Sequence, residues 1–217
     1  MRVLIAGGHG QIAMRLERLL TLRGDEAIGL IRNPDHGAEL ADVGATAVVL
    51  DLEQAGAEDL LPELDGVDAV VFAAGAGPGS GAARKDTVDR AAAALLADAA
   101  EQAGVRRYIL ISSMGAGKPV PPGTDEVFAA YLKAKSASED DLRARDLDWT
   151  VLRPGRLTNE PGTGRVTLDE SVDRGEISRD DVAAVVLKLL DEPRTALLNL
   201  ELAGGEVPID EAVDRLA

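Results

Sequence analysis

The feature that most constrains the fold of this chain is a regular alternation of short apolar runs with longer amphipathic segments. Each run is bounded by Gly, Pro or Asp, as expected for a strand that is buried in a parallel sheet. The runs that we expect to form strands span residues 2–6, 27–32, 45–50, 69–73, 108–112, 149–152 and 196–202. This alternation predicts an α/β fold, a doubly wound parallel sheet with helices on both faces and right-handed crossovers.

Helical patterns fill the segments between these runs. In the first segment Ile12, Leu16 and Leu20 place apolar side chains on one face, and Gly24 ends the pattern. The other segments with a helical pattern span residues 87–102, 126–145 and 180–190. No repeat, low-complexity tract or linker interrupts the 217 residues, so we expect residues 1–217 to form a single domain.

The charge of the chain and the residue types that it lacks narrow the classes of partner and site. The formal net charge is −15, so the surface repels nucleic acids and anionic membranes, and neither is expected as a partner. Cysteine is absent and His9 and His36 are the only histidines, so no metal site is expected. Residues 1–6 run into a glycine-rich turn without the pattern of a signal peptide, which predicts a cytoplasmic protein.

The glycine-rich turn lies between the first predicted strand and the first predicted helix, in the spacing G-x-x-G-x-x-A. Gly7 permits a tight turn, Gly10 lets the backbone approach a pyrophosphate, and Ala13 allows close packing of the helix on the strand. The N–H groups at the start of the helix are expected to bind the anion. A glycine turn needed only for steric reasons is the alternative, but the strand–turn–helix context favours a dinucleotide. The residues predicted to bind it are Gly7, Gly8, His9, Gly10, Gln11 and Ile12.

The ends of the next three strands suit the adenosine part of such a cofactor. Arg32 follows the second strand, where a site that prefers NAD usually has a carboxylate for the ribose 2′-hydroxyl, whereas an arginine suits a 2′-phosphate. We therefore expect NADP(H), with NAD less favoured; an ordinary exposed arginine is the alternative. Asp51 and Leu52 end the third strand, where a carboxylate and a backbone amide can bracket adenine. Small residues that leave room beside the ribose end the fourth strand: Ala73, Ala74 and Gly75.

With these motifs the chain resembles the short-chain dehydrogenase/reductase superfamily, specifically its atypical members, which are related to NAD(P)-dependent epimerase/dehydratases and to NmrA-like proteins. Besides the glycine turn, the resemblance rests on Arg32-Asn33-Pro34, Asp51-Leu52, Ala73-Ala74-Gly75, Ile111-Ser112-Ser113, Tyr131-Leu132-Lys133-Ala134-Lys135, Leu152-Arg153-Pro154-Gly155 and residues 177–183. It covers almost the whole chain and implies an NAD(P)-binding Rossmann domain.

The resemblance also implies how the second half of the chain is used. Pro154 and Gly155 are expected to pass close to the nicotinamide. Two departures from the family are visible. The glycine turn closes on Ala13 rather than glycine, and the region after Pro154 is shorter than in members that modify nucleotide sugars. Residues 155–217 are therefore expected to contribute only a small substrate-side region.

A candidate catalytic set lies in the same half of the chain. Tyr131 and Lys135 are four residues apart on a predicted helix and share one face, and an ammonium group one turn away favours the phenolate form of a tyrosine. The resemblance implies a Ser–Tyr–Lys set in which Ser113 holds the substrate carbonyl and Lys135 also bonds the nicotinamide ribose. Ser112 is less suited, because it lies one residue deeper in the strand. A chance Tyr-x-x-x-Lys in a charged helix is the alternative.

Together these observations predict an NADP(H)-dependent oxidoreductase that acts on a small molecule, an unidentified carbonyl, quinone or similar acceptor. Two alternatives are a non-catalytic NADP(H)-binding redox sensor of the NmrA-like kind and an NAD-dependent epimerase/dehydratase. The Ser–Tyr–Lys set favours an enzyme, whereas Arg32 and the short substrate-side region disfavour an epimerase. The sequence leaves the oligomeric state open.

Overall fold

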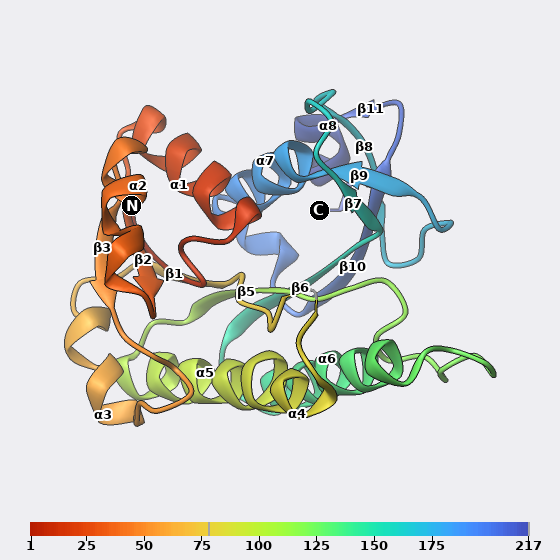
Figure 1. Ribbon diagram of the computed structural model, residues 1–217. Coiled ribbons are helices and arrows are strands. Elements are labelled where there is room, and N and C mark those ends of the chain that lie inside the picture. Colours follow the sequence, from red (N-terminus) through yellow and green to blue (C-terminus); the bar gives the residue numbers. More distant parts are fainter. Residues whose placement is uncertain (78, 217) are drawn as a thin grey trace.

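A large, mostly parallel sheet forms the centre of the computed structural model, which describes residues 1–77 and 79–216 (Figure 1). Pro78 and Ala217, both within the predicted domain, lie outside the described residues. In the described chain the strands of the main sheet follow the order β11-β8-β10-β6-β5-β4-β1-β2-β3. They are β1 (Arg2–Ala6), β2 (Glu26–Ile31), β3 (Thr46–Val49), β4 (Ala69–Phe72), β5 (Arg107–Ile111), β6 (Asp148–Pro154), β8 (Arg165–Asp169), β10 (Leu198–Gly204) and β11 (Val207–Pro208). The run 3-2-1-4-5-6 is the doubly wound Rossmann order, so the predicted fold class is confirmed.

Helices cover both faces of this sheet (Figure 1). One face carries α1 (Gln11–Arg23), α7 (Arg179–Leu190) and α8 (Ile209–Asp214). The other face carries α4 (Ala82–Arg84), the π-helix η3 (Lys85–Ala92), α5 (Ala93–Ala103) and α6 (Glu126–Arg143). Shorter helices connect these elements along the chain: η1 (Pro34–His36), α2 (Gly37–Asp42), α3 (Ala57–Leu60), η2 (Pro62–Leu64) and η4 (Pro193–Thr195).

Each face of the sheet buries its own apolar core. Because successive side chains of a strand point to opposite faces, β1 sends Val3 and Ile5 into the core under α1 and α7, and Leu4 into the core under α5. Both cores are mainly aliphatic, in keeping with the few aromatic residues of the chain.

The C-terminal part of the chain extends the sheet instead of forming a separate cap. β10 pairs in parallel with β6, but β8 runs antiparallel to β10, and β11 runs antiparallel to β8. The prediction of a purely parallel sheet therefore misses one edge. In β8 the buried Val166 and Leu168 alternate with exposed neighbours, which is typical of a half-buried antiparallel strand. β7 (Arg156–Thr158) and β9 (Glu176–Ser178) form a separate two-stranded sheet.

The predicted helix over residues 87–102 is two helices of different kinds. Residues Lys85–Ala92 wind as a π-helix, and α5 takes over as an α-helix at Ala93. Hydrophobic periodicity alone does not separate these two forms, because both bury one face against the sheet. π-Helical turns are rare and often lie at functional sites.

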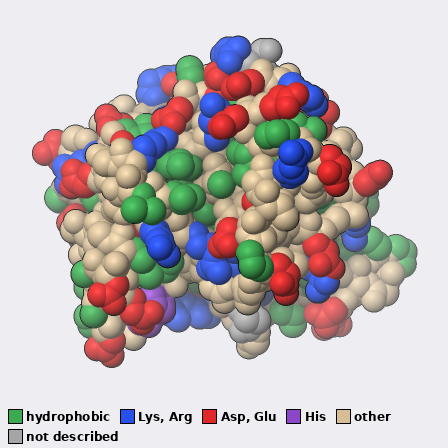
Figure 2. Space-filling model, turned by 90° about the horizontal axis from the view of Figure 1, so that it is seen from above, with side chains coloured by type: hydrophobic (Ala, Val, Ile, Leu, Met, Phe, Trp, Pro, Cys, Tyr) green, Lys and Arg blue, Asp and Glu red, His purple; other side chains and the backbone are tan. Residues whose placement is uncertain are grey.

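The surface carries charges of both signs. Figure 2 shows acidic and basic side chains interspersed over the face covered by α1 and α7, with no single large patch of one sign. Among the described residues no helix is both long and apolar enough to cross a membrane. In the same residues no three His, Cys, Asp or Glu side chains come together in a way that could hold a metal ion.

Candidate dinucleotide-binding and catalytic site

A cavity of about 280 Å³ opens at the carboxyl ends of β1, β2, β3 and β4. It lies beside the point where the strand order reverses between β1 and β4, which is where open α/β sheets bind their ligands. Many residues predicted to bind the cofactor line it: Gly7, His9, Gly10, Arg32, Asp51, Leu52, Ala73, Ala74 and Gly75. Residues from four separate strand ends therefore meet in one cavity, as the sequence pattern predicts.

At Gly7 and Gly8 the glycine turn leaves no room for a side chain. Gly7 has a φ of +79°, and a Cβ atom there would lie 2.7 Å from the Cα of Ala74. A Cβ at Gly8 would lie 2.7 Å from the Cα of Gly29, so Gly8 packs against β2 and does not line the cavity. Gly10 caps α1 without a side chain, and no acidic residue lies in the first turn. The positive end of α1 thus faces the cavity with no acidic side chain in its first turn, which fits a pyrophosphate.

Gln11 and Ile12 form the first turn of α1 and do not line the cavity themselves. Their backbone N–H groups lie at the helix N-terminus, where an α-helix has no intrahelical acceptors for them. We therefore expect Gln11 and Ile12 to bind the cofactor through their backbone N–H groups and not through their side chains.

A buried carboxyl group lies beneath the glycine turn. Glu17 of α1 is fully buried, and neither of its carboxyl oxygens has a hydrogen-bond partner in the described structure. A Cβ atom at Gly29 would lie 2.6 Å from its Oε1, and one at Gly8 would lie 3.0 Å away. Burial raises the pKa of Glu17 to about 8. Glu17 was not among the residues predicted from the sequence, although its spacing from Ala13 and Leu20 places it on the buried stripe of α1.

Two arginines share one carboxylate at the adenosine end of the cavity. Arg32 lies 3.6 Å from Oε2 of Glu53, and Arg84 of α4 lies 2.8 Å from the same oxygen. The hydroxyl of Thr87 donates to the other oxygen of Glu53 at 2.6 Å. Arg84 and Glu53 also line the cavity, and neither was predicted from the sequence. Two guanidinium groups and one carboxylate thus lie together at this end of the cavity.

Both histidines of the chain lie at the same end of the cavity. The rings of His9 and His36 stack with their centres 3.6 Å apart, and Nε2 of His9 lies 3.0 Å from a carboxylate oxygen of Glu39. The hydrogen bond with His9 lowers the pKa of Glu39 below its usual range. His9 therefore lines the cavity as predicted, in the company of a second imidazole that the sequence did not place there.

The structure brings Tyr131 and Lys135 together on α6. The Nζ atom of Lys135 lies 5.9 Å from the centre of the Tyr131 ring. The lysine is buried, donates to the carbonyl oxygen of Ile111 at 3.0 Å, and pairs with Asp89 of η3 at 3.3 Å. The ring of Phe128 stacks on that of Tyr131 with the centres 5.9 Å apart. Asp89 is a partner of Lys135 that the sequence analysis did not anticipate.

The two serines after β5 have different surroundings. Ser112 is buried and donates to Glu139 at 2.6 Å, so its hydroxyl is engaged in the interior. Ser113 is half-buried, and its hydroxyl lies 3.4 Å from the carbonyl oxygen of Met114. Among the described contacts none joins Ser113 to Tyr131 or Lys135, so the predicted triad stays a prediction.

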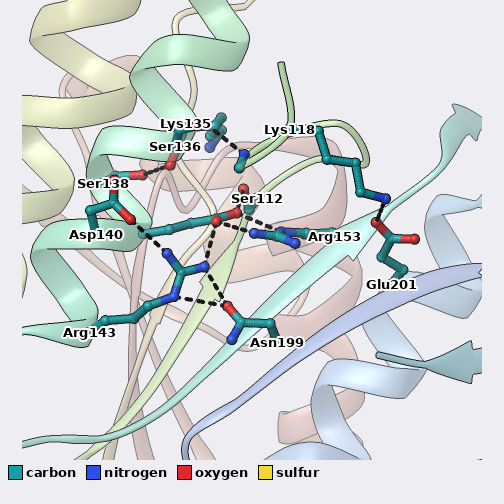
Figure 3. A network of polar contacts seen from close by, with 12 residues as sticks. Ser112, Lys118, Lys135, Ser136, Ser138, Asp140, Arg143, Arg153, Asn199 and Glu201 are labelled. Carbon is teal, nitrogen blue, oxygen red and sulfur yellow. Dashed lines mark hydrogen bonds and ion pairs between the residues drawn. The ribbon is translucent and has the colours of Figure 1, made fainter. Parts of the chain in front are cut away.

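A polar network centred on Glu139 fixes α6 to the sheet, and Figure 3 shows part of it. Arg153, at the end of β6, bonds both oxygens of the buried Glu139, and Arg143 approaches it at 2.8 Å. These bonds raise the pKa of Arg153 above its usual range. Beside this network Lys118 pairs with the buried Glu201 of β10. Since Glu139 lies one turn after Lys135, the network holds the catalytic candidates of α6 against β5 and β6.

Pro154 and Gly155 lie at the end of β6 and outside the cavity lining. The carbonyl oxygen of Pro154 accepts a hydrogen bond from Met114 at 3.0 Å. A Cβ atom at Gly155 would lie 2.2 Å from the carbonyl oxygen of Gly175, so close backbone packing requires glycine there. Their predicted approach to the nicotinamide stays an expectation.

The strand order, the glycine turn and the cavity at the reversal point together define an NAD(P)-binding Rossmann protein. The family described as NAD(P)H-binding matches residues 7–193, and the chain belongs to this family. The predicted relationship to atypical short-chain dehydrogenases/reductases is consistent with this match.

Individual relatives carry enzyme names. The chain is 37% identical over 217 residues to an uncharacterised sugar epimerase of Bacillus subtilis (strain 168), with 100% of both chains covered. A solved structure of a putative NAD-dependent epimerase/dehydratase from Bacillus halodurans is 36% identical, with a TM-score of 0.91 and 99% of both chains covered. The oxidoreductase ylbE from Lactococcus lactis is 25% identical, with a TM-score of 0.87, and the match covers 100% of this chain and 96% of that one.

Proposed function

We propose that this protein is an NADP(H)-dependent oxidoreductase that acts on a small carbonyl, quinone or similar acceptor. The observation that carries the proposal is the position of Asp89. Its Oδ1 atom lies 3.3 Å from the ammonium of Lys135, and a Cβ atom at Gly75, in the cavity wall, would lie 3.2 Å from the same oxygen. The side chain of Asp89 thus connects Lys135 of the candidate catalytic pair with the cavity wall at Gly75, which supports the proposal.

Different residues around the cavity bind different parts of the cofactor. The glycine turn and the start of α1 receive the pyrophosphate, Asp51 and Leu52 bracket the adenine, and Arg32 with Arg84 receives the 2′-phosphate. When bound, NADPH supplies a hydride to the acceptor. Tyr131 supplies the proton, and Ser113 orients the acceptor oxygen. Lys135 donates a hydrogen bond to the nicotinamide ribose. It also fixes the position of the face of α6 that carries Tyr131.

An NAD-dependent epimerase or dehydratase is a second candidate, because Glu53 is a carboxylate at the adenosine end of the cavity. A carboxylate there can accept a hydrogen bond from the ribose 2′-hydroxyl of NAD. The names of the Bacillus relatives fit this candidate, whereas the two arginines beside Glu53 favour the phosphate of NADP. A redox sensor that binds NADP(H) without turnover is a third.

Measuring NADPH oxidation against a panel of aldehydes, ketones, quinones and flavins tests the proposed activity. We expect at least one class of acceptor to be reduced with turnover proportional to enzyme. Tight NADPH binding with no turnover on any class would favour the sensor. Conversion of a nucleotide sugar without net oxidation of cofactor would favour the epimerase.

We expect the protein to bind NADP(H) at least about tenfold more tightly than NAD(H), a difference of about 1.4 kcal/mol. The physical reason is the pairing of Arg32 with the 2′-phosphate. Arg32→Ala should therefore reduce this preference, and calorimetric titration of both cofactors measures it. Arg18→Ala removes the same charge from an exposed site on α1 and should leave the preference unchanged. Equal affinities in the parent protein would contradict the assignment of Arg32.

A further inference from the structure

The π-helix η3 directs two charged side chains into the interior beside Tyr131 and Lys135. Lys85 and Asp89 are both buried, with exposed fractions of 8% and 0%. Lysine and aspartate are seldom buried to this extent unless they are paired or functional. Each of them therefore has to be accounted for by a contact or by a role.

The burial of Asp89 is explained by its ion pair with Lys135. Its carboxylate lies 3.3 Å from the ammonium of Lys135, and the N–H of Ala76 donates to its other oxygen at 3.3 Å. Both side chains of this pair are almost completely buried, so solvent does not screen the attraction between them. The positive charge of Lys135 is therefore largely offset by Asp89 before it acts on Tyr131.

For Lys85 the structure describes no such partner. Among the described residues its ammonium forms no ion pair, and its one hydrogen bond goes to the carbonyl oxygen of Gly77 at 2.8 Å. The same ammonium lies 5.4 Å from the centre of the Tyr131 ring, slightly nearer than that of Lys135 at 5.9 Å. Of the charged groups described around this ring, namely Lys85, Lys135 and Asp89, Lys85 is the one whose charge is not offset.

We propose that Lys85 is a positioning residue for the proposed reaction, and that it is the cation that stabilises the phenolate of Tyr131. This rests on the proposed oxidoreductase function. In the reduction, the O–H bond of Tyr131 breaks and its proton forms the new O–H bond of the product. The electron pair comes as a hydride from the reduced nicotinamide. The negative charge left on Tyr131 is then stabilised by the neighbouring ammonium of Lys85.

Because the chain has few aromatic residues, the effect of Lys85 on the phenolate of Tyr131 can be measured without a substrate. Tyr108 and Tyr131 are its only tyrosines, and burial raises the pKa of Tyr108 well above its usual range. The phenolate absorbance that is lost in Tyr131→Phe therefore reports Tyr131 alone. Circular dichroism at each pH confirms that the protein is still folded.

Lys85→Gln is the decisive variant, because glutamine can still donate to Gly77 but carries no charge. We expect its phenolate absorbance to develop about one to two pH units higher than in the parent protein, the effect of losing one nearby opposite charge. Lys85→Arg retains the charge and should restore most of the shift. Lys133→Gln removes an exposed lysine of α6, the helix that carries Tyr131, and should move the midpoint by less than about 0.3 units, because solvent screens that charge.

An unchanged midpoint in Lys85→Gln, or an equal shift in Lys133→Gln, would overturn the proposal. The titration does not depend on finding the acceptor, so a protein that shows the shift but turns over nothing would refute the proposed function alone. If an acceptor is found, the fall of turnover with rising pH should move in Lys85→Gln by the same amount as the absorbance, because the reduction needs the protonated phenol of Tyr131. A loss of turnover without that movement would assign Lys85 a purely structural role.

Discussion

Replacing Tyr131 by phenylalanine should reduce turnover by about two to four orders of magnitude while leaving cofactor affinity nearly unchanged. The reason is that only the phenol hydroxyl is lost, and a general acid typically contributes a rate factor of this size. The ring remains in place, stacked on Phe128. Steady-state kinetics with the best acceptor and calorimetric titration of NADPH measure the two effects.

The other tyrosine provides the matched control. Tyr108 is fully buried in the core under α5, with its hydroxyl 3.3 Å from the carbonyl oxygen of Ala93. Tyr108→Phe also removes one phenol hydroxyl, but from a residue that does not line the cavity, and should leave turnover within about twofold. An acceptor that turns over equally well with Tyr131→Phe would exclude Tyr131 as the proton donor, even if the protein is an enzyme.

The stability of the protein should fall by about 3 to 5 kcal/mol between pH 5 and pH 8 because of Glu17 alone. The pKa of this carboxyl is raised from 4.5 to about 8 in the folded protein, so in this interval the folded state holds a proton that the unfolded chain has lost. The stabilisation is therefore complete below pH 4.5 and is lost as the pH rises through about 8. Denaturant unfolding at several pH values measures the slope.

Glu17→Gln should abolish this slope, because glutamine is neutral at every pH and nearly the same size as the protonated acid. The variant should be about as stable as the parent protein at pH 5 and clearly more stable at pH 8. Glu206→Gln changes an exposed glutamate and should keep the parental slope. A parental slope in Glu17→Gln would show that the carboxyl reaches water or an unseen partner when it ionises.

The fold could be predicted because its signal is repeated along the chain. Seven apolar runs separated by helical patterns define the parallel part of the sheet, and the structure confirms it. The antiparallel edge was missed because β8 is only half-buried and follows no helix, so its alternating pattern is short and weak. The π-helix was missed because its extra residue per turn leaves no mark in a pattern read at helical spacing.

The cavity side of the site could be predicted because each of its residues directly follows a strand. The carboxyl ends of parallel strands lie at the same edge of a sheet. A correct strand order therefore places Gly7, Arg32, Asp51 and Gly75 close together. Arg84, Glu53 and Asp89 follow no such rule. They reach the site from helices or loops, and the charge pairing that selects them depends on distances that no spacing in the sequence reveals.

The π-helical turns of η3 make the number of residues in this segment as important as their identity. A π-helix differs from an α-helix by an additional residue in each turn, and one α-helical residue corresponds to a rotation of about 100°. Deleting one residue between Lys85 and Asp89 would therefore rotate Lys85 away from Tyr131 while Asp89 kept its place beside Lys135. A family member with a one-residue gap here would retain the buried pair and lose the second cation, even with lysine in the aligned position. The number of residues in η3 therefore helps to distinguish relatives that share the cavity but differ in the chemistry of the site.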